Sequence, residues 1–264
     1  MIRFRLSSLF LLSVFLSPQA NAESGEEAAA RVLAILQNTS HLPPAEVPAS
    51  PGEAKISFVQ LDPADSWSLG VLRVMRVRVP PHKMISVIDD IPAYVGLFKD
   101  LLVAKRTPAA GHEFVLFTET HIPLPLVAND RTSVRYHCQI TNARRLTSFE
   151  LVEGNHLGGL DGASLLLPLK DGESVYLQLS FVHVAYGMAR ALPVKMFWAE
   201  NAMGSLQADW ALKLRAEQPA HAAEEILEES EGFSRAQFDR IKAAFEKPRK
   251  LADFIASLKA NKSP

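Results

Sequence analysis

The residues that could perform acid–base or metal chemistry are scattered along the sequence. Asp89 and Asp90 are adjacent carboxylates that could share a proton, but aspartates just before a proline are also typical of a helix start. We therefore interpret one as a helix cap and the other as solvated. Metal binding would require three or four of the eight histidines to converge. His112 and His121 point to opposite faces of one expected strand, and His137 lies on the polar face of the next. We predict no catalytic residue and no metal site.

Sequence motifs typical of enzymes are missing. The chain contains no Gly-x-Ser-x-Gly, no His-Glu-x-x-His, no phosphate-binding loop and no dinucleotide fingerprint, so no cofactor is predicted. The glycine-rich run Gly158–Gly162 lies between two expected strands and is interpreted as a loop. Cys138 is the only cysteine, which excludes a disulfide or a cysteine-based zinc cluster within this sequence. In a strand it is expected to be a small buried apolar side chain.

The first 22 residues have the layout of a secretory signal peptide. Arg3 and Arg5 precede the apolar run Leu9–Leu16, and Ala20-Asn21-Ala22 offers small residues for cleavage after Ala22. A buried N-terminal helix is the alternative interpretation. The mature chain is therefore expected to begin near Glu23 and to be periplasmic or secreted. No later stretch has the roughly 20 apolar residues of a membrane helix, so no transmembrane anchor is expected in the mature chain.

The charges give no broad electrostatic field. The 28 basic residues nearly balance the 29 acidic ones, which argues against a nucleic-acid partner. A hydrophobic share of 48% is enough for a sizeable core.

The strand and helix patterns follow a restrictive order. Residues 23–53 form a short helix and a proline-rich linker, and residues 219–264 an amphipathic helical tail. Between them, residues 54–218 give strands, two short helices (82–88 and 91–101), a meander of strands and a long helix from Pro193. An antiparallel sheet has an apolar face that must be covered, and only the long helix is large enough. This predicts an α+β fold in which a curved antiparallel sheet wraps around that helix and encloses a ligand cavity.

The stretch Val77–Phe98 resembles the opening of the START-like (SRPBCC) superfamily, in its polyketide cyclase/dehydrase and lipid-transport branch. A strand ends at prolines, a helix and an aspartate follow, and a second helix carries Tyr94 and Phe98. The order of later elements matches over roughly residues 71–217. The resemblance implies a helix-grip domain that holds an apolar ligand, here in a secreted member. Met84, Asp89, Tyr94 and Phe98 also resemble quinone-binding relatives, although Gly96 and Leu97 depart from their pattern.

Ligand-contacting residues are expected on the sheet face toward the long helix and on that helix. Val175, Leu177, Leu179 and Phe181 share one apolar face, which His183 continues, so we expect these side chains to point into the cavity. The candidate ligand-binding residues are Tyr94, Phe98, Phe114, Leu116, Tyr136, Phe181, His183, Met196, Met203 and Trp210. Each of them alone is better explained as plain core than as a ligand contact, and only the expected fold makes the set a hypothesis.

The function predicted from these observations is an exported binding protein for a lipid or other apolar small molecule. One alternative is a cyclase/dehydrase-type enzyme that uses the same cavity. Another is an interaction protein that self-associates or docks a partner through its helical tail. A filled cavity would favour the interaction protein, and an open cavity with a polar cluster and perturbed ionisation would favour the enzyme. The tail carries too many large apolar residues to be left exposed, so we expect it to pack on the body or on a second copy.

Overall fold

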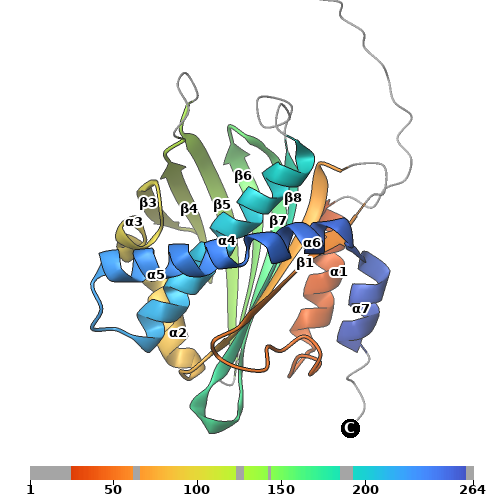
Figure 1. The fold of residues 1–264 in the computed structure, drawn as a ribbon, viewed down its shortest axis with the longest axis horizontal. Helices are drawn as coiled ribbons and strands as arrows, with labels where there is room; N and C mark the ends of the chain where they lie inside the picture. Colours follow the sequence, from red (N-terminus) through yellow and green to blue (C-terminus); the bar gives the residue numbers. More distant parts are fainter. Residues whose placement is uncertain (1–24, 62–65, 123–127, 142–143, 185–192, 260–264) are drawn as a thin grey trace, which may run out of the picture.

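The computed structural model describes residues 25–61, 66–122, 128–141, 144–184 and 193–259 of the chain. The expected signal peptide, residues 1–22, lies outside the described residues. The centre of the molecule is a nine-stranded sheet in the order β3-β4-β5-β6-β7-β8-β2-β1-β9 (Figure 1). Neighbouring strands are antiparallel except for the short parallel pair β1–β9. The strands are β1 Ala54–Gln60, β2 Ser68–Val77, β3 Leu101–Pro108, β4 Glu113–Thr120, β5 Asp130–Thr141, β6 Arg144–Gly154, β7 Leu157–Pro168, β8 Ser174–Val184 and β9 Arg249–Lys250.

One long helix, α4 (Val194–Glu217), packs on one face of this sheet (Figure 1). Pro193 stands at its N-cap position, where the missing N–H leaves no helical hydrogen bond unmade. The predicted α+β helix-grip fold, a large antiparallel sheet packed on a long helix, is confirmed. None of the helices within the described ranges combines the length and the apolar character needed to cross a bilayer.

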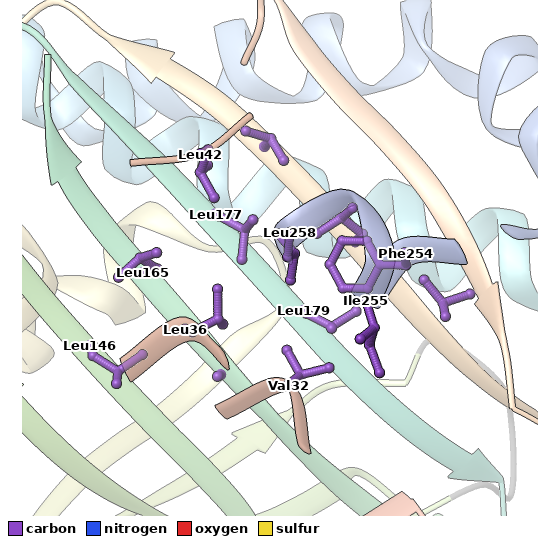
Figure 2. Close-up of a cluster of buried hydrophobic side chains, with 14 of the residues drawn as sticks. Val32, Leu36, Leu42, Leu146, Leu165, Leu177, Leu179, Phe254, Ile255 and Leu258 are labelled. Carbon is purple, nitrogen blue, oxygen red and sulfur yellow. The ribbon is translucent and has the colours of Figure 1, made fainter. Parts of the chain in front are cut away.

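Both faces of the sheet are covered. The face opposite α4 packs against α1 (Gly25–Gln37) and α7 (Leu251–Lys259), the first and the last described helices (Figure 2). Val32 and Leu36 of α1 lie one helical turn apart and are fully buried there. The face that we expected to point toward the long helix, with Leu177, Leu179 and Phe181, is this outer one. The expectation was wrong because a period of two separates the two faces of a strand but does not say which one meets α4.

The two short helices expected before the meander differ in length. The first, α2 (Pro81–Asp89), extends one residue beyond each end of the expected range 82–88 and has a proline at its first position. The second is a 3-10 turn at Ile91–Ala93 followed by the four-residue α3 (Tyr94–Leu97), and it ends before the expected Leu101. Asp100 has a φ of 60°, a left-handed turn that redirects the backbone. Leu101 then pairs with Thr120 in the β3–β4 ladder, so sheet pairing stops the helix early.

The tail beyond α4 is part of the folded body. Helix α5 (Ala223–Ala236) packs along α4, where the rings of Trp210 and Phe233 stack with centroids 3.5 Å apart. Helix α6 (Phe238–Glu246) buries Ile241 completely and places Phe245 edge-on against Phe58 of β1, at 5.5 Å. Together with α7 these helices cover apolar surface on both sides of the sheet, so the prediction that the tail packs on the body is confirmed.

The glycine-rich run expected to be a loop lies inside strand β7. A Cβ atom built on Gly162 would lie 2.2 Å from the carbonyl oxygen of Leu179 and 2.5 Å from the ring of Phe149. These contacts are shorter than any that a side chain could make, so only glycine fits where β7 runs beneath the Phe149 ring. Gly162 therefore serves close packing of strands and not a turn.

Candidate ligand cavity

A cavity of about 870 Å³ lies between α4 and the face of the sheet that α4 covers. Known small-molecule sites span about 300–1,000 Å³, so this cavity has room for a drug-sized or larger ligand. Strands β2–β8 supply its floor, and α2, α3, α4 and α5 supply the rest of its wall. Its apolar lining consists of Ile88, Ile91, Phe98, Leu101, Phe114, Leu116, Val134, Phe149, Leu157, Leu160, Leu166, Met203 and Leu212.

Six of the ten candidate ligand-binding residues lie on this wall: Tyr94, Phe98, Phe114, Leu116, Tyr136 and Met203. They come from α3, β4, β5 and α4. Tyr94 and Phe98 bring their rings to 4.6 Å from each other, and Phe114 and Tyr136 stack at 5.0 Å across the β4–β5 ladder. The arrangement brings two aromatic pairs from separate elements to one space.

The other four candidates lie away from the cavity. Phe181 is on the outer face of the sheet, in the cluster beneath α1 and α7. His183 is exposed near the end of β8, with Nδ1 2.6 Å from the hydroxyl of Ser68. Met196 is half exposed in the first turn of α4. Trp210 points from α4 toward α5, because α4 is covered on a second side by the tail and therefore has two apolar faces.

The most buried polar residues of the cavity wall were missed by the sequence analysis. Arg73 of β2 donates through Nε to Asp209 Oδ2 of α4 at 2.5 Å, and each residue is 4% exposed. Burial raises the pKa of Asp209, while the charge and hydrogen bond of Arg73 oppose that rise. A signal was present, because Arg73 falls on the same period-two positions as Met75 and Val77, and a charged residue on an apolar face requires a buried partner.

A second arginine, Arg145 of β6, lies in the same wall. Its Nε donates to Thr147 Oγ1 at 3.1 Å, and its Nη2 lies 2.9 Å from Asp89 Oδ1 and 3.3 Å from Cys138 Sγ. Asp89 is thus an ion-pair partner at the end of α2, and Asp90, at the start of the 3-10 turn, makes no side-chain cap. The expected side-chain cap was wrong: Asp90 occupies the N-cap position without a cap hydrogen bond, and Asp89 is held by its ion pair with Arg145.

Three tyrosines also belong to the cavity wall. Tyr94 donates its hydroxyl to the Ile88 carbonyl oxygen at 2.5 Å, and Tyr176 donates to Gln178 Oε1 at 3.2 Å. Burial raises the pKa of Tyr136 to about 12 and, as the first cause, raises the pKa of Tyr94 and Tyr176 as well. All three hydroxyls are therefore protonated near neutral pH, and those of Tyr94 and Tyr176 act as hydrogen-bond donors.

The rim of the cavity includes part of the tail. Glu231, Ser234 and Arg235 of α5 belong to the wall together with Lys99, which follows α3. Lys99 and Arg235 both form ion pairs with Glu231. Within the described residues, no group of His, Cys, Asp or Glu could hold a metal ion. The site is a mixed space in which apolar and aromatic side chains alternate with polar ones, including the buried Arg73–Asp209 pair and Arg145.

No protein-family model and no curated protein matches the chain. Several solved structures are similar to it. The Zhui aromatase/cyclase from Streptomyces sp. R1128 shares 12% identity at a TM-score of 0.46, over 59% of this chain and 98% of that one. The STAR-related lipid transfer protein from Xanthomonas axonopodis shares 17% at 0.49, over 65% and 97%. Human STARD10 shares 13% at 0.47, over 74% and 80%. The chain is structurally similar to START-related proteins at low sequence identity.

Proposed function

We propose that this protein binds a lipid or other apolar small molecule in the cavity between α4 and the sheet. The observation that carries the proposal is the 870 Å³ space itself, whose wall combines aliphatic and aromatic side chains with polar ones. Burial of apolar ligand surface there would supply the affinity, at about 25 cal/mol per Å². The few buried polar groups would supply selectivity. The apolar residues of the tail are buried against the body, which argues against a tail that serves mainly to dock a partner.

An enzyme acting in the same cavity is the second candidate, and one observation favours it. Asp209 is a buried carboxylate with a raised pKa whose charge also raises the pKa of Tyr176, as expected for an acid in an active site. The hydrogen bond that Asp209 accepts from Arg73 favours the binding role, because this bond holds the carboxylate in place and occupies one of the carboxylate oxygens.

Filling the cavity tests the binding proposal. Ala208 of α4 belongs to the cavity wall, whereas Ala256 of α7 is exposed on the other side of the sheet. Ala208→Trp is expected to weaken binding of the neutral dye N-phenylnaphthylamine by about tenfold or more, because the indole takes the space of the ligand. Ala256→Trp is the matched control and should leave the affinity within about twofold. Fluorescence titration measures both, with far-ultraviolet circular dichroism to verify folding.

Two results would count against a binding cavity: no dye binding by the natural sequence, or equal binding by both variants. Mass spectrometry of the small molecules that copurify with the protein separates carrier from enzyme. A carrier returns a supplied ligand unchanged in both mass and chromatographic retention, and an enzyme changes at least one of them.

We propose further that the protein is exported and that its mature chain begins near Glu23. The layout of Arg3, Arg5, Leu9–Leu16 and Ala20-Asn21-Ala22 supports this. N-terminal sequencing of the protein isolated from its native cells is expected to begin at or near Glu23. A soluble cytoplasmic protein that retains Met1 would contradict export and leave the cavity proposal unaffected.

A further inference from the structure

Two buried nitrogen atoms in the cavity wall have no hydrogen-bond acceptor. Among the described residues, none accepts from Arg145 Nη1 of the sheet or from Gln207 Nε2 of α4. Both residues line the cavity, and they are 4% and 8% exposed. A buried donor without a partner destabilises a fold, so nearly all such groups in proteins are satisfied by protein, water or ligand. The two unsatisfied groups belong to opposite walls of one cavity.

The buried charged residues of the cavity wall leave an excess of positive charge. Arg73 and Asp209 pair with each other, and both are almost fully buried. Arg145 is equally buried, but the side chain of its carboxylate partner, Asp89, is 39% exposed. The carboxylate of Asp89 is therefore partly solvated and neutralises Arg145 only in part. As a result, the buried interior is locally positive. The other charged residues of the wall are exposed or half-buried: Lys99, Asp100, Asp130, Glu200, Glu231 and Arg235.

We propose that the ligand is an amphiphile with a carboxylate group, which accepts hydrogen bonds from the guanidinium of Arg145 while its apolar part occupies the rest of the cavity. This inference rests on the proposed binding function and names its ligand class. A guanidinium matches a carboxylate in shape and charge, and the hydrogen bonds between them are about twice as strong as those between neutral groups. The amide of Gln207 supplies a further donor from α4.

Other head groups fit the wall less well. A primary amine would add a positive charge beside Arg145, whose carboxylate partner is partly exposed, and like charges in a buried site repel. An alcohol offers a single neutral oxygen and leaves the charge of Arg145 without a buried counterion. An alcohol or an amine could still bind through its apolar part. The cavity would therefore bind all three classes of ligand, the carboxylate most tightly and the amine most weakly.

A series of ligands with one chain and different head groups tests this ranking on the unaltered protein. The probes are hexadecanoate, hexadecanol and hexadecylamine, each displacing N-phenylnaphthylamine from delipidated full-length protein at about pH 8, where a carboxylate is ionised. We expect hexadecanoate to bind about tenfold or more tightly than hexadecanol, because it gains a charge-assisted hydrogen bond. Hexadecylamine should bind more weakly than hexadecanol.

A matched pair of variants assigns the preference to Arg145. Arg145→Met should reduce the preference for carboxylate over alcohol to about threefold or less, with hexadecanol bound as before. Arg135→Met removes the same charge from the exposed, opposite face of β5, where Arg135 pairs with Glu150, and should leave the preference intact. If Arg145→Met does not fold, the ranking by the unaltered protein still decides the ligand class.

The outcomes separate the two proposals. In one outcome the dye binds while hexadecanoate and hexadecanol bind with equal affinity, and in another the dye binds while neither of them binds. Either result would overturn the carboxylate inference and leave the binding function standing. A preference that survives in folded Arg145→Met would also overturn the role of Arg145. Failure of the dye and of all three probes to bind would overturn the binding function itself.

Discussion

Asp209→Leu is expected to lower the free energy of unfolding by about 3–5 kcal/mol, because it leaves the guanidinium of Arg73 buried without its counterion. The two side chains lie 2.5 Å apart at a contact between β2 and α4, and their side chains are 5% and 6% exposed. A charge in such a place has no access to water that could replace the lost partner. Urea unfolding followed by circular dichroism measures the loss.

The double variant Arg73→Met/Asp209→Leu should recover most of this loss, since replacing both members of a buried ion pair by apolar residues is often close to neutral. Arg76→Met is the control on the same strand. Arg76 pairs with Glu173 at the surface, with its side chain 29% exposed, so its removal should cost about 1 kcal/mol or less. A double variant as unstable as the single one, or a loss for Asp209→Leu no larger than that for Arg76→Met, would contradict this expectation.

Phe254→Ala is expected to lower the free energy of unfolding by about 3–5 kcal/mol, the usual cost of truncating a buried phenylalanine. Phe254 of α7 is fully buried on the outer face of the sheet, among side chains that include Val32 of α1 and Leu179 of β8 (Figure 2). The cavity left behind would be bounded by three separate elements, which limits its collapse.

Lys259→Ala, at the exposed end of the same helix, is the control and should change stability by no more than about 0.5 kcal/mol. Chemical denaturation of both variants decides the question. A loss below about 1 kcal/mol for Phe254→Ala would mean that α7 is a loosely attached appendage, and that the outer face of the sheet folds without it.

The local elements of this protein could be predicted from its sequence because each depends on neighbouring residues. Pro193 and the apolar spacing after it indicate α4, and alternation from Ser133 to Ile140 indicates β5. Their order along the chain was enough to predict a sheet wrapped on a long helix. Aromatic residues such as Phe114 and Tyr136 reached the cavity as expected, because they lie on the strand faces that meet α4.

Tertiary structure alone decided which face of each strand meets which layer. The sheet is apolar on both sides, so the alternation in β8 fits two orientations, and the packing of α1 and α7 fixes Phe181 outside the cavity. The same limit applies to the polar site. Arg73 and Asp209 are 136 positions apart, and no periodicity links them. The sequence by itself determined the elements and their order, since these follow from local backbone preferences and spacing. The cavity, its buried charges and the unsatisfied nitrogen of Arg145 depend on contacts between distant segments, which only the folded chain brings together.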